Sequence, residues 1–214
     1  MQGVRDLMAS DARLQLHLLT STDPQAVAGP AFVEGHIGVN RDPGSKTAAF
    51  NEVMAKGFGQ QGGIALYKYC YIDFSSTTDV AMVFENYQKN VGELKKKYPL
   101  LVLAHSTVPL TTDEQSGSFK DRTKGMLRKL MGRDPNVKRN QFNQLLKQTY
   151  GGKDPILDIA EIESTRSDGS RTYFSRAGQK VYTLAPEFTT DGGHLNEAGR
   201  RAGAQQLLAL LASL

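Results

Sequence analysis

The chain is short of the residues that mark several classes of protein. It has no tryptophan and a single cysteine, Cys70, among its 214 residues, so no disulfide can form within it. Cys70 lies in an apolar stretch and is predicted to be a small core residue. No run approaches the roughly 18 apolar residues that a membrane-spanning helix needs, and stable membrane insertion is not expected. These absences predict a soluble domain without internal disulfides.

The positive and negative charges of the chain nearly balance. Lys and Arg number 26 and Asp and Glu 22, which gives a formal net charge of +4. No Lys/Arg-rich run is interleaved with aromatic residues that would stack on bases, so nucleic-acid binding is not predicted. The chain has four histidines, and none of them forms a paired His/Asp spacing on one helix face, so a metal site is not expected either.

The remaining composition favours a single α/β domain. Predicted strands alternate with predicted helices, and residues 164–188 are predicted to form a loop excursion with one short strand pair. The strands are expected at residues 14–20, 64–74, 100–110 and 156–163, and the helices at residues 3–14, 46–57, 80–98, 137–150 and after 196. This alternation is typical of a mainly parallel sheet in a three-layer α/β/α sandwich, with its ligand crevice at the carboxyl ends of the strands. Because the first element is a helix, the first strand of the sheet is expected to be missing from this sequence.

The tetrad Asp191-Gly192-Gly193-His194 lies where a last strand would pass to a last helix. It puts a carboxylate and an imidazole on one short turn, and the two glycines allow the chain to bend tightly. A carboxylate that fixes the imidazole tautomer and stabilises the imidazolium supplies two members of a Ser-His-Asp triad. The alternative is that His194 only hydrogen-bonds a helix end.

This tetrad, continued by Leu195, Asn196 and Gly199, resembles the last sequence block of the SGNH hydrolase superfamily, also called GDSL hydrolases. The resemblance covers most of the chain. It implies a flavodoxin-like α/β/α fold and a serine esterase or acylhydrolase that uses no cofactor. It also implies that His194 is the general base and that Asp191 orients it.

A second block of the family supplies a glycine amide to the oxyanion hole. The segment from His36 to Asn40 (HIGVN) resembles it, which makes Gly38 the candidate donor and His36 a candidate pocket residue. The family's third block reads Gly-x-Asn-Asp, but this chain has YCYIDFS at the corresponding place. The second donor is therefore open: Asp73 would donate only when protonated, and Asn40 is the substitute.

The family's first block, a serine at a strand-to-helix turn, has no counterpart here. The nucleophile is therefore expected upstream of Met1, and the chain alone is expected to be inactive. Ser106, after a predicted strand, is an internal alternative that lacks a nucleophile-elbow pattern and is more simply a residue that lines the site. An export signal would lie in the missing segment, so a periplasmic or secreted location is compatible with the sequence and the compartment stays open.

The implied substrate is an acetylated carbohydrate or a small acyl ester. Two alternatives remain: a non-catalytic domain that binds a glycan or a protein in the same crevice, and a different α/β enzyme, such as a transferase, with His194 as base. A basic insertion is expected at about residues 111–136, as a solvated surface helix or as an amphipathic lid on membranes or acidic glycans. Its basic residues are Lys120, Arg122, Lys124, Arg128, Lys129 and Arg133. The sequence leaves the oligomeric state open.

Overall fold

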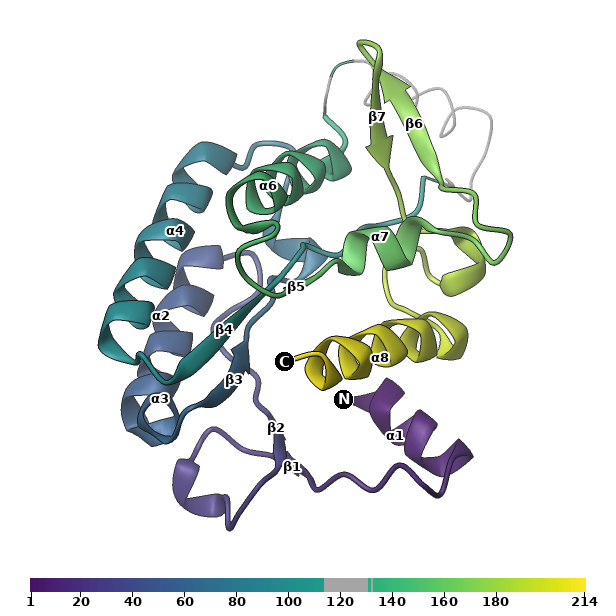
Figure 1. The fold of residues 1–214 in the computed structure, drawn as a ribbon. Helices are drawn as coiled ribbons and strands as arrows, with labels where there is room; N and C mark the ends of the chain where they lie inside the picture. Colours follow the sequence, from purple (N-terminus) through teal and green to yellow (C-terminus); the bar gives the residue numbers. More distant parts are fainter. Residues whose placement is uncertain (114–130, 132) are drawn as a thin grey trace.

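The computed structural model describes residues 1–113, 131 and 133–214. Helices pack on both sides of a parallel strand layer (Figure 1), which confirms the predicted α/β/α sandwich. One side carries α2 (Pro43–Val53), α3 (Gly59–Gln61), α4 (Val80–Lys97) and α6 (Pro135–Tyr150). The other side carries α1 (Gln2–Ser10) and α8 (Glu197–Ala212), which lie side by side. The predicted basic helix or lid lies outside the described residues, except for Met131 and Arg133.

The strands of the described chain form three separate hydrogen-bonded sets. Strand β1 (Leu18–Thr20) pairs in parallel with β2 (Phe32–Glu34). Strands β3 (Gly63–Leu66), β4 (Leu101–Ser106) and β5 (Ile156–Leu157) form a second parallel set in that order. Strands β6 (Tyr173–Arg176) and β7 (Gln179–Tyr182) form an antiparallel hairpin, as the predicted strand pair required. No ladder joins β2 to β3 within the described ranges, so each of these strands has an unpaired edge.

The main core lies between strands β3 and β4 and the helices α2, α4 and α6. Helix α4 buries one face, because its apolar residues recur at spacings of three and four: Val80, Val83, Phe84, Tyr87, Val91 and Leu94. Phe142 and Leu146 of α6 are fully buried in the same cluster. A smaller cluster on the other side joins Val4 and Leu7 of α1 to Ala204 of α8, and these two clusters hold the helices against the strand layer.

The strand predicted over residues 64–74 is much shorter than expected. It ends at Leu66, and the chain then turns into a one-turn helix, η3 (Tyr71–Asp73). The cause is the Asp73 carboxylate, whose Oδ2 accepts the Cys70 amide hydrogen at 2.7 Å. A side chain that bonds its own backbone in this way competes with strand pairing, and the aromatic residues of this segment pack into the core instead.

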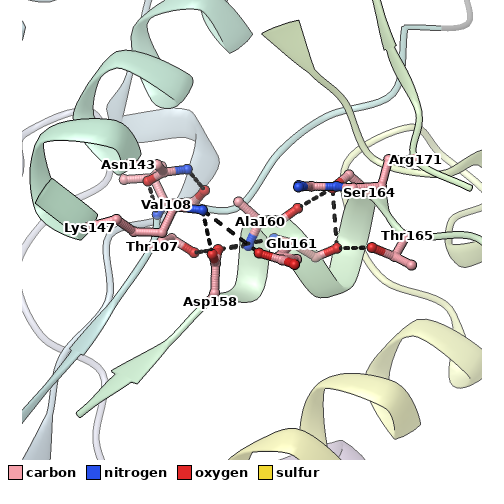
Figure 2. A network of polar contacts seen from close by, with 10 residues as sticks. All are labelled: Thr107, Val108, Asn143, Lys147, Asp158, Ala160, Glu161, Ser164, Thr165 and Arg171. Atoms are coloured by element: carbon pink, nitrogen blue, oxygen red, sulfur yellow. Dashed lines mark hydrogen bonds and ion pairs between the residues drawn. The ribbon is translucent and has the colours of Figure 1, made fainter. Parts of the chain in front are cut away.

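The strand predicted over residues 156–163 is wrong beyond Leu157. Asp158 is the N-cap of α7 (Ile159–Ser164) and accepts the Glu161 amide hydrogen at 3.1 Å. The Thr107 hydroxyl donates to Asp158 at 3.1 Å and accepts the Ala160 amide at 2.9 Å, as the network in Figure 2 shows. An aspartate cap with such partners starts a helix, so it overrides the alternating pattern of the sequence. Short one-turn segments complete the connections: η1 (Pro24–Ala26), η2 (Met54–Phe58) and η4 (Pro186–Phe188).

Candidate active site

Asp191 and His194 are in direct contact on the turn that leads from η4 to α8. Asp191 Oδ2 lies 2.6 Å from His194 Nδ1, and Oδ1 accepts the amide hydrogens of Gly193 at 2.9 Å and His194 at 2.7 Å. Gly192 has a φ of 87°, a conformation that glycine adopts without strain. The aspartate thus folds the turn and holds the imidazole with the same carboxylate.

This geometry sets the charge and the tautomer of the pair. Hydrogen bonds from the Gly193 amide, and then from the imidazole and amide of His194, hold the pKa of Asp191 well below its usual range. The carboxylate is therefore ionised at neutral pH and accepts the Nδ1–H of the imidazole. Nε2 is left as the acceptor, which is the form that a general base needs. The His194 side chain is 75% exposed, so solvent and ligands reach it.

Tyr71 is the residue that Nε2 faces, and it was not among the predicted site residues. The Tyr71 hydroxyl lies 3.4 Å from His194 Nε2, and the two rings are edge to face with centroids 5.6 Å apart. Gly193 packs on the same phenol: a methyl group there would lie 2.9 Å from the Tyr71 ring. The contact joins residues far apart in the sequence, and the only local signal was an aromatic stretch that favoured a strand.

A buried arginine supports Tyr71. Arg139 of α6 is 4% exposed, and its Nε donates to the Tyr71 carbonyl at 3.0 Å. Its Nη1 donates to Thr111 Oγ1 at 2.7 Å and to Asn136 Oδ1 at 2.8 Å. Burial lowers the pKa of Arg139 to about 10, so the guanidinium stays charged at neutral pH. Arg139 therefore ties η3 to α6 and to the segment after β4.

The turn lies at the carboxyl ends of the central strands. The Thr112 amide, which follows β4, donates to the Gly192 carbonyl at 2.9 Å, and Tyr71 follows β3. The Met1 ammonium lies 3.2 Å from Glu34, the last residue of β2, so the chain starts at the same edge of the strand layer. Proteins with parallel sheets bind their ligands at this edge.

Several solved structures share this fold over nearly the whole chain. A GDSL-like lipase from Bacteroides thetaiotaomicron has a TM-score of 0.51 at 12% identity, covering 99% of this chain and 98% of that chain. An acetyl xylan esterase has a TM-score of 0.50 at 14% identity, covering 98% and 91%. A Bacteroides fragilis protein provisionally assigned as an acylhydrolase has a TM-score of 0.54 at 14% identity, covering 98% and 95%.

The chain has the SGNH hydrolase fold. No family model and no curated protein matches its sequence. At identities this low the shared fold does not carry an activity with it.

Gly38, the oxyanion donor that the SGNH resemblance suggested, lies against the first turn of α2. Its φ is 61°, and a methyl group there would lie 2.6 Å from the Cα and N of Lys46. Glycine is therefore required at this position. Asn40 is nearby, and its Oδ1 accepts a hydrogen bond from Lys46 Nζ at 3.2 Å, an arrangement that leaves Nδ2 without a hydrogen bond to any described residue.

Asp73 links three segments of this SGNH fold through its buried carboxylate. Its side chain is fully buried, and Oδ2 lies 2.7 Å from Lys46 Nζ. Its two oxygens also accept the amide hydrogens of Arg41 at 2.8 Å and Cys70 at 2.7 Å. Both Asp73 oxygens are thus bound to donors within the fold. The bond to Arg41 also holds that residue at a φ of 70°, which is uncommon outside glycine.

Ser106 is not brought to the Asp191–His194 pair. Ser106 is buried at 3% exposure, and its hydroxyl donates to the Thr107 carbonyl at 3.1 Å. It lies inside the fold because the last residue of β4 pairs with β5, so it does not line the site as expected. His36 is exposed on the connection between β2 and α2.

The described residues also bear on metal binding and membrane spanning. Among the described residues, no group of three or more His, Cys, Asp or Glu side chains is arranged to hold a metal ion. No helix in the same ranges has both the length and the apolar character needed to cross a membrane.

Proposed function

We propose that this chain forms the greater part of a serine hydrolase that cleaves ester bonds. One observation carries the proposal: Asp191 holds Nδ1 of His194 at 2.6 Å and leaves Nε2 at the carboxyl edge of the strands. The names of the fold neighbours, a lipase, an acylhydrolase and an acetyl xylan esterase, support an ester as the substrate class. The proposed substrate is an acetylated carbohydrate or a small acyl ester.

The proposed nucleophile is a serine upstream of Met1. The backbone nitrogen of Met1 lies 3.2 Å from Glu34 Oε2, which puts Met1 at the carboxyl end of β2, the edge that also carries His194. The unpaired edges of β2 and β3 offer backbone partners for a further parallel strand. A strand that entered there would end close to Met1 and present its last residues at the site, as a nucleophile requires.

The reaction follows the logic of a Ser-His-Asp triad. His194 Nε2 takes the proton of the serine hydroxyl while the serine oxygen attacks the ester carbonyl, and Asp191 stabilises the imidazolium that forms. The Gly38 amide binds the oxyanion, with Asn40 Nδ2 as the second donor. The imidazolium then gives its proton to the departing alcohol, and a water molecule, activated by His194, releases the acid and restores the serine.

The test uses the protein expressed with the sequence that precedes Met1 in its gene, and p-nitrophenyl acetate as substrate. Substituting His194→Ala is expected to lower kcat by about 10²–10⁴-fold, and Asp191→Asn by about 10⁴-fold, because the wrong tautomer is held. His17→Ala is the matched control, since His17 is exposed and its side chain has no hydrogen bond in the described structure. Full activity in the His194→Ala variant would reject the proposal, and an inactive parent protein would favour a non-catalytic binding domain.

A further inference from the structure

A pocket of about 600 Å³ opens beside Tyr71, the residue that faces His194 Nε2. It is formed where the first turns of α2, α4 and α6 meet η3. Its apolar walls are Pro43, Ile72, Phe74, Met82, Val83 and Pro135, and its polar lining is Arg41, Asp73, Ser75, Thr78, Asp79 and Arg139. None of these apolar side chains is needed for the proton transfers of the proposed mechanism. We therefore expect the pocket to bind a part of the ligand that does not react.

The charged groups around the pocket are mostly committed to other partners. Asp79 caps α4 by accepting the Met82 amide at 3.1 Å, Asp73 pairs with Lys46, and Arg139 is bound to Tyr71 and α6. Only Arg41, on the exposed rim, has a side chain with no hydrogen bond or ion pair in the described structure. A sugar would bring many hydroxyls that need partners, whereas an apolar chain would need only the walls.

We infer that this pocket binds the acyl chain of the substrate, so that the preferred ester carries an acyl group longer than acetyl. The inference rests on the proposed function and narrows its substrate class. The leaving alcohol must face His194 to receive its proton, and His194 is 75% exposed to solvent. The other substituent of the carbonyl is then directed past Tyr71, and Tyr71 is itself a wall of the pocket.

The size of the pocket indicates how much chain it takes. The methyl group of an acetyl ester would occupy a small part of 600 Å³. Further methylenes would pack against the apolar walls, because the buried charged groups of Asp73 and Arg139 are already hydrogen-bonded within the fold. Each buried methylene is expected to raise kcat/KM by about fourfold. The preference should therefore climb over several carbons and then level off once the pocket is full.

The first experiment measures kcat/KM for p-nitrophenyl esters from acetate to decanoate, on the protein expressed with its upstream sequence. We expect a rise from acetate to the medium-chain esters. Met82→Asp places a charge in the wall at a position that is 55% exposed, so the fold tolerates it, and it should flatten the rise of kcat/KM with chain length. Met82→Leu should keep the preference. Leu100→Asp is the matched control, because Leu100 is 76% exposed and lies outside the pocket.

A second measurement separates this inference from the proposed function. The ε-methyl signal of Met82 is followed by NMR as octanoate or acetate is added, a readout that needs no turnover. A saturable shift with octanoate and none with acetate supports the pocket even in a protein that hydrolyses no ester. Each of four results would overturn the inference. In the kinetic assays these are an active enzyme that prefers acetate, an unchanged chain-length series in Met82→Asp, and a chain-length preference confined to alkyl acetates. In the NMR titration it is the absence of a shift with octanoate.

Discussion

The ion pair between Asp73 and Lys46 gives the sharpest prediction about what holds the site together. The Asp73 side chain is fully buried and that of Lys46 is 9% exposed, with Oδ2 and Nζ 2.7 Å apart. The substitution Asp73→Asn keeps the shape and removes the charge. It leaves a buried ammonium without its counter-charge, a loss that costs about 3–5 kcal/mol when one partner of a buried pair is removed.

The amide hydrogen bonds point the same way. Both Asp73 oxygens accept backbone hydrogens, from Arg41 and from Cys70, so the NH₂ group of an asparagine would have to face one of these donors. An unsatisfied buried donor costs about 1–3 kcal/mol, and this cost overlaps with the first. We therefore expect Asp73→Asn to lower the free energy of unfolding by about 4 kcal/mol, a large part of the roughly 5–15 kcal/mol of a typical domain.

Urea denaturation followed by circular dichroism measures this loss for Asp73→Asn, Lys46→Met and the double variant. The double variant removes both charges, so it should recover at least half of the loss of the single Asp73 variant. A loss under about 1 kcal/mol, combined with a large fall in ester hydrolysis, would refute the structural role. Asp73 would then act on the substrate.

Two further predictions concern Tyr71 and Glu163. Tyr71→Phe keeps the ring that packs on Gly193 and removes the hydroxyl, whose 3.4 Å contact with His194 Nε2 is long for a hydrogen bond. We therefore expect kcat to stay within about threefold of the parent value. A fall beyond about 10²-fold would make the hydroxyl part of the proton transfer. Burial raises the pKa of Glu163 to about 7 from 4.5, so the folded protein keeps this carboxyl protonated between pH 4.5 and 7. The stabilisation that this protonated group contributes is complete below pH 4.5 and is lost as the pH rises to about 7. The loss in the free energy of unfolding is about 3 kcal/mol, and Glu163→Gln should abolish this pH dependence. Tm values of the two proteins that change in parallel across that pH range would contradict the assignment.

Local patterns in the sequence predicted the layers of the fold and the contact between Asp191 and His194. The helix α4 follows from its apolar spacing, and the Asp191–His194 contact lies within one short turn, so nearby residues determine both. The hairpin of β6 and β7 was predicted for the same reason.

Contacts between distant segments could not be predicted. The strand at residues 64–74 was expected from its aromatic and β-branched residues, yet Asp73, held by Lys46 and Arg41 from another segment, turns the chain. Tyr71 and Arg139 belong to the site through contacts between η3, α6 and the final turn. Strand β2 lay in a Pro/Gly-containing stretch predicted as loop, because its ladder with β1 leaves no periodic signal in three residues. Tertiary partners override local propensity in each of these places.

Covalent labelling with a fluorophosphonate probe tests the central claim most directly. The protein is expressed with the sequence that precedes Met1 in its gene, and the labelled residue is located by peptide mass spectrometry. The account predicts a single modified serine upstream of Met1, with labelling that falls by about 10²-fold or more in His194→Ala and is unchanged in His17→Ala. Labelling of a serine within residues 1–214, or labelling that does not depend on His194, would contradict it.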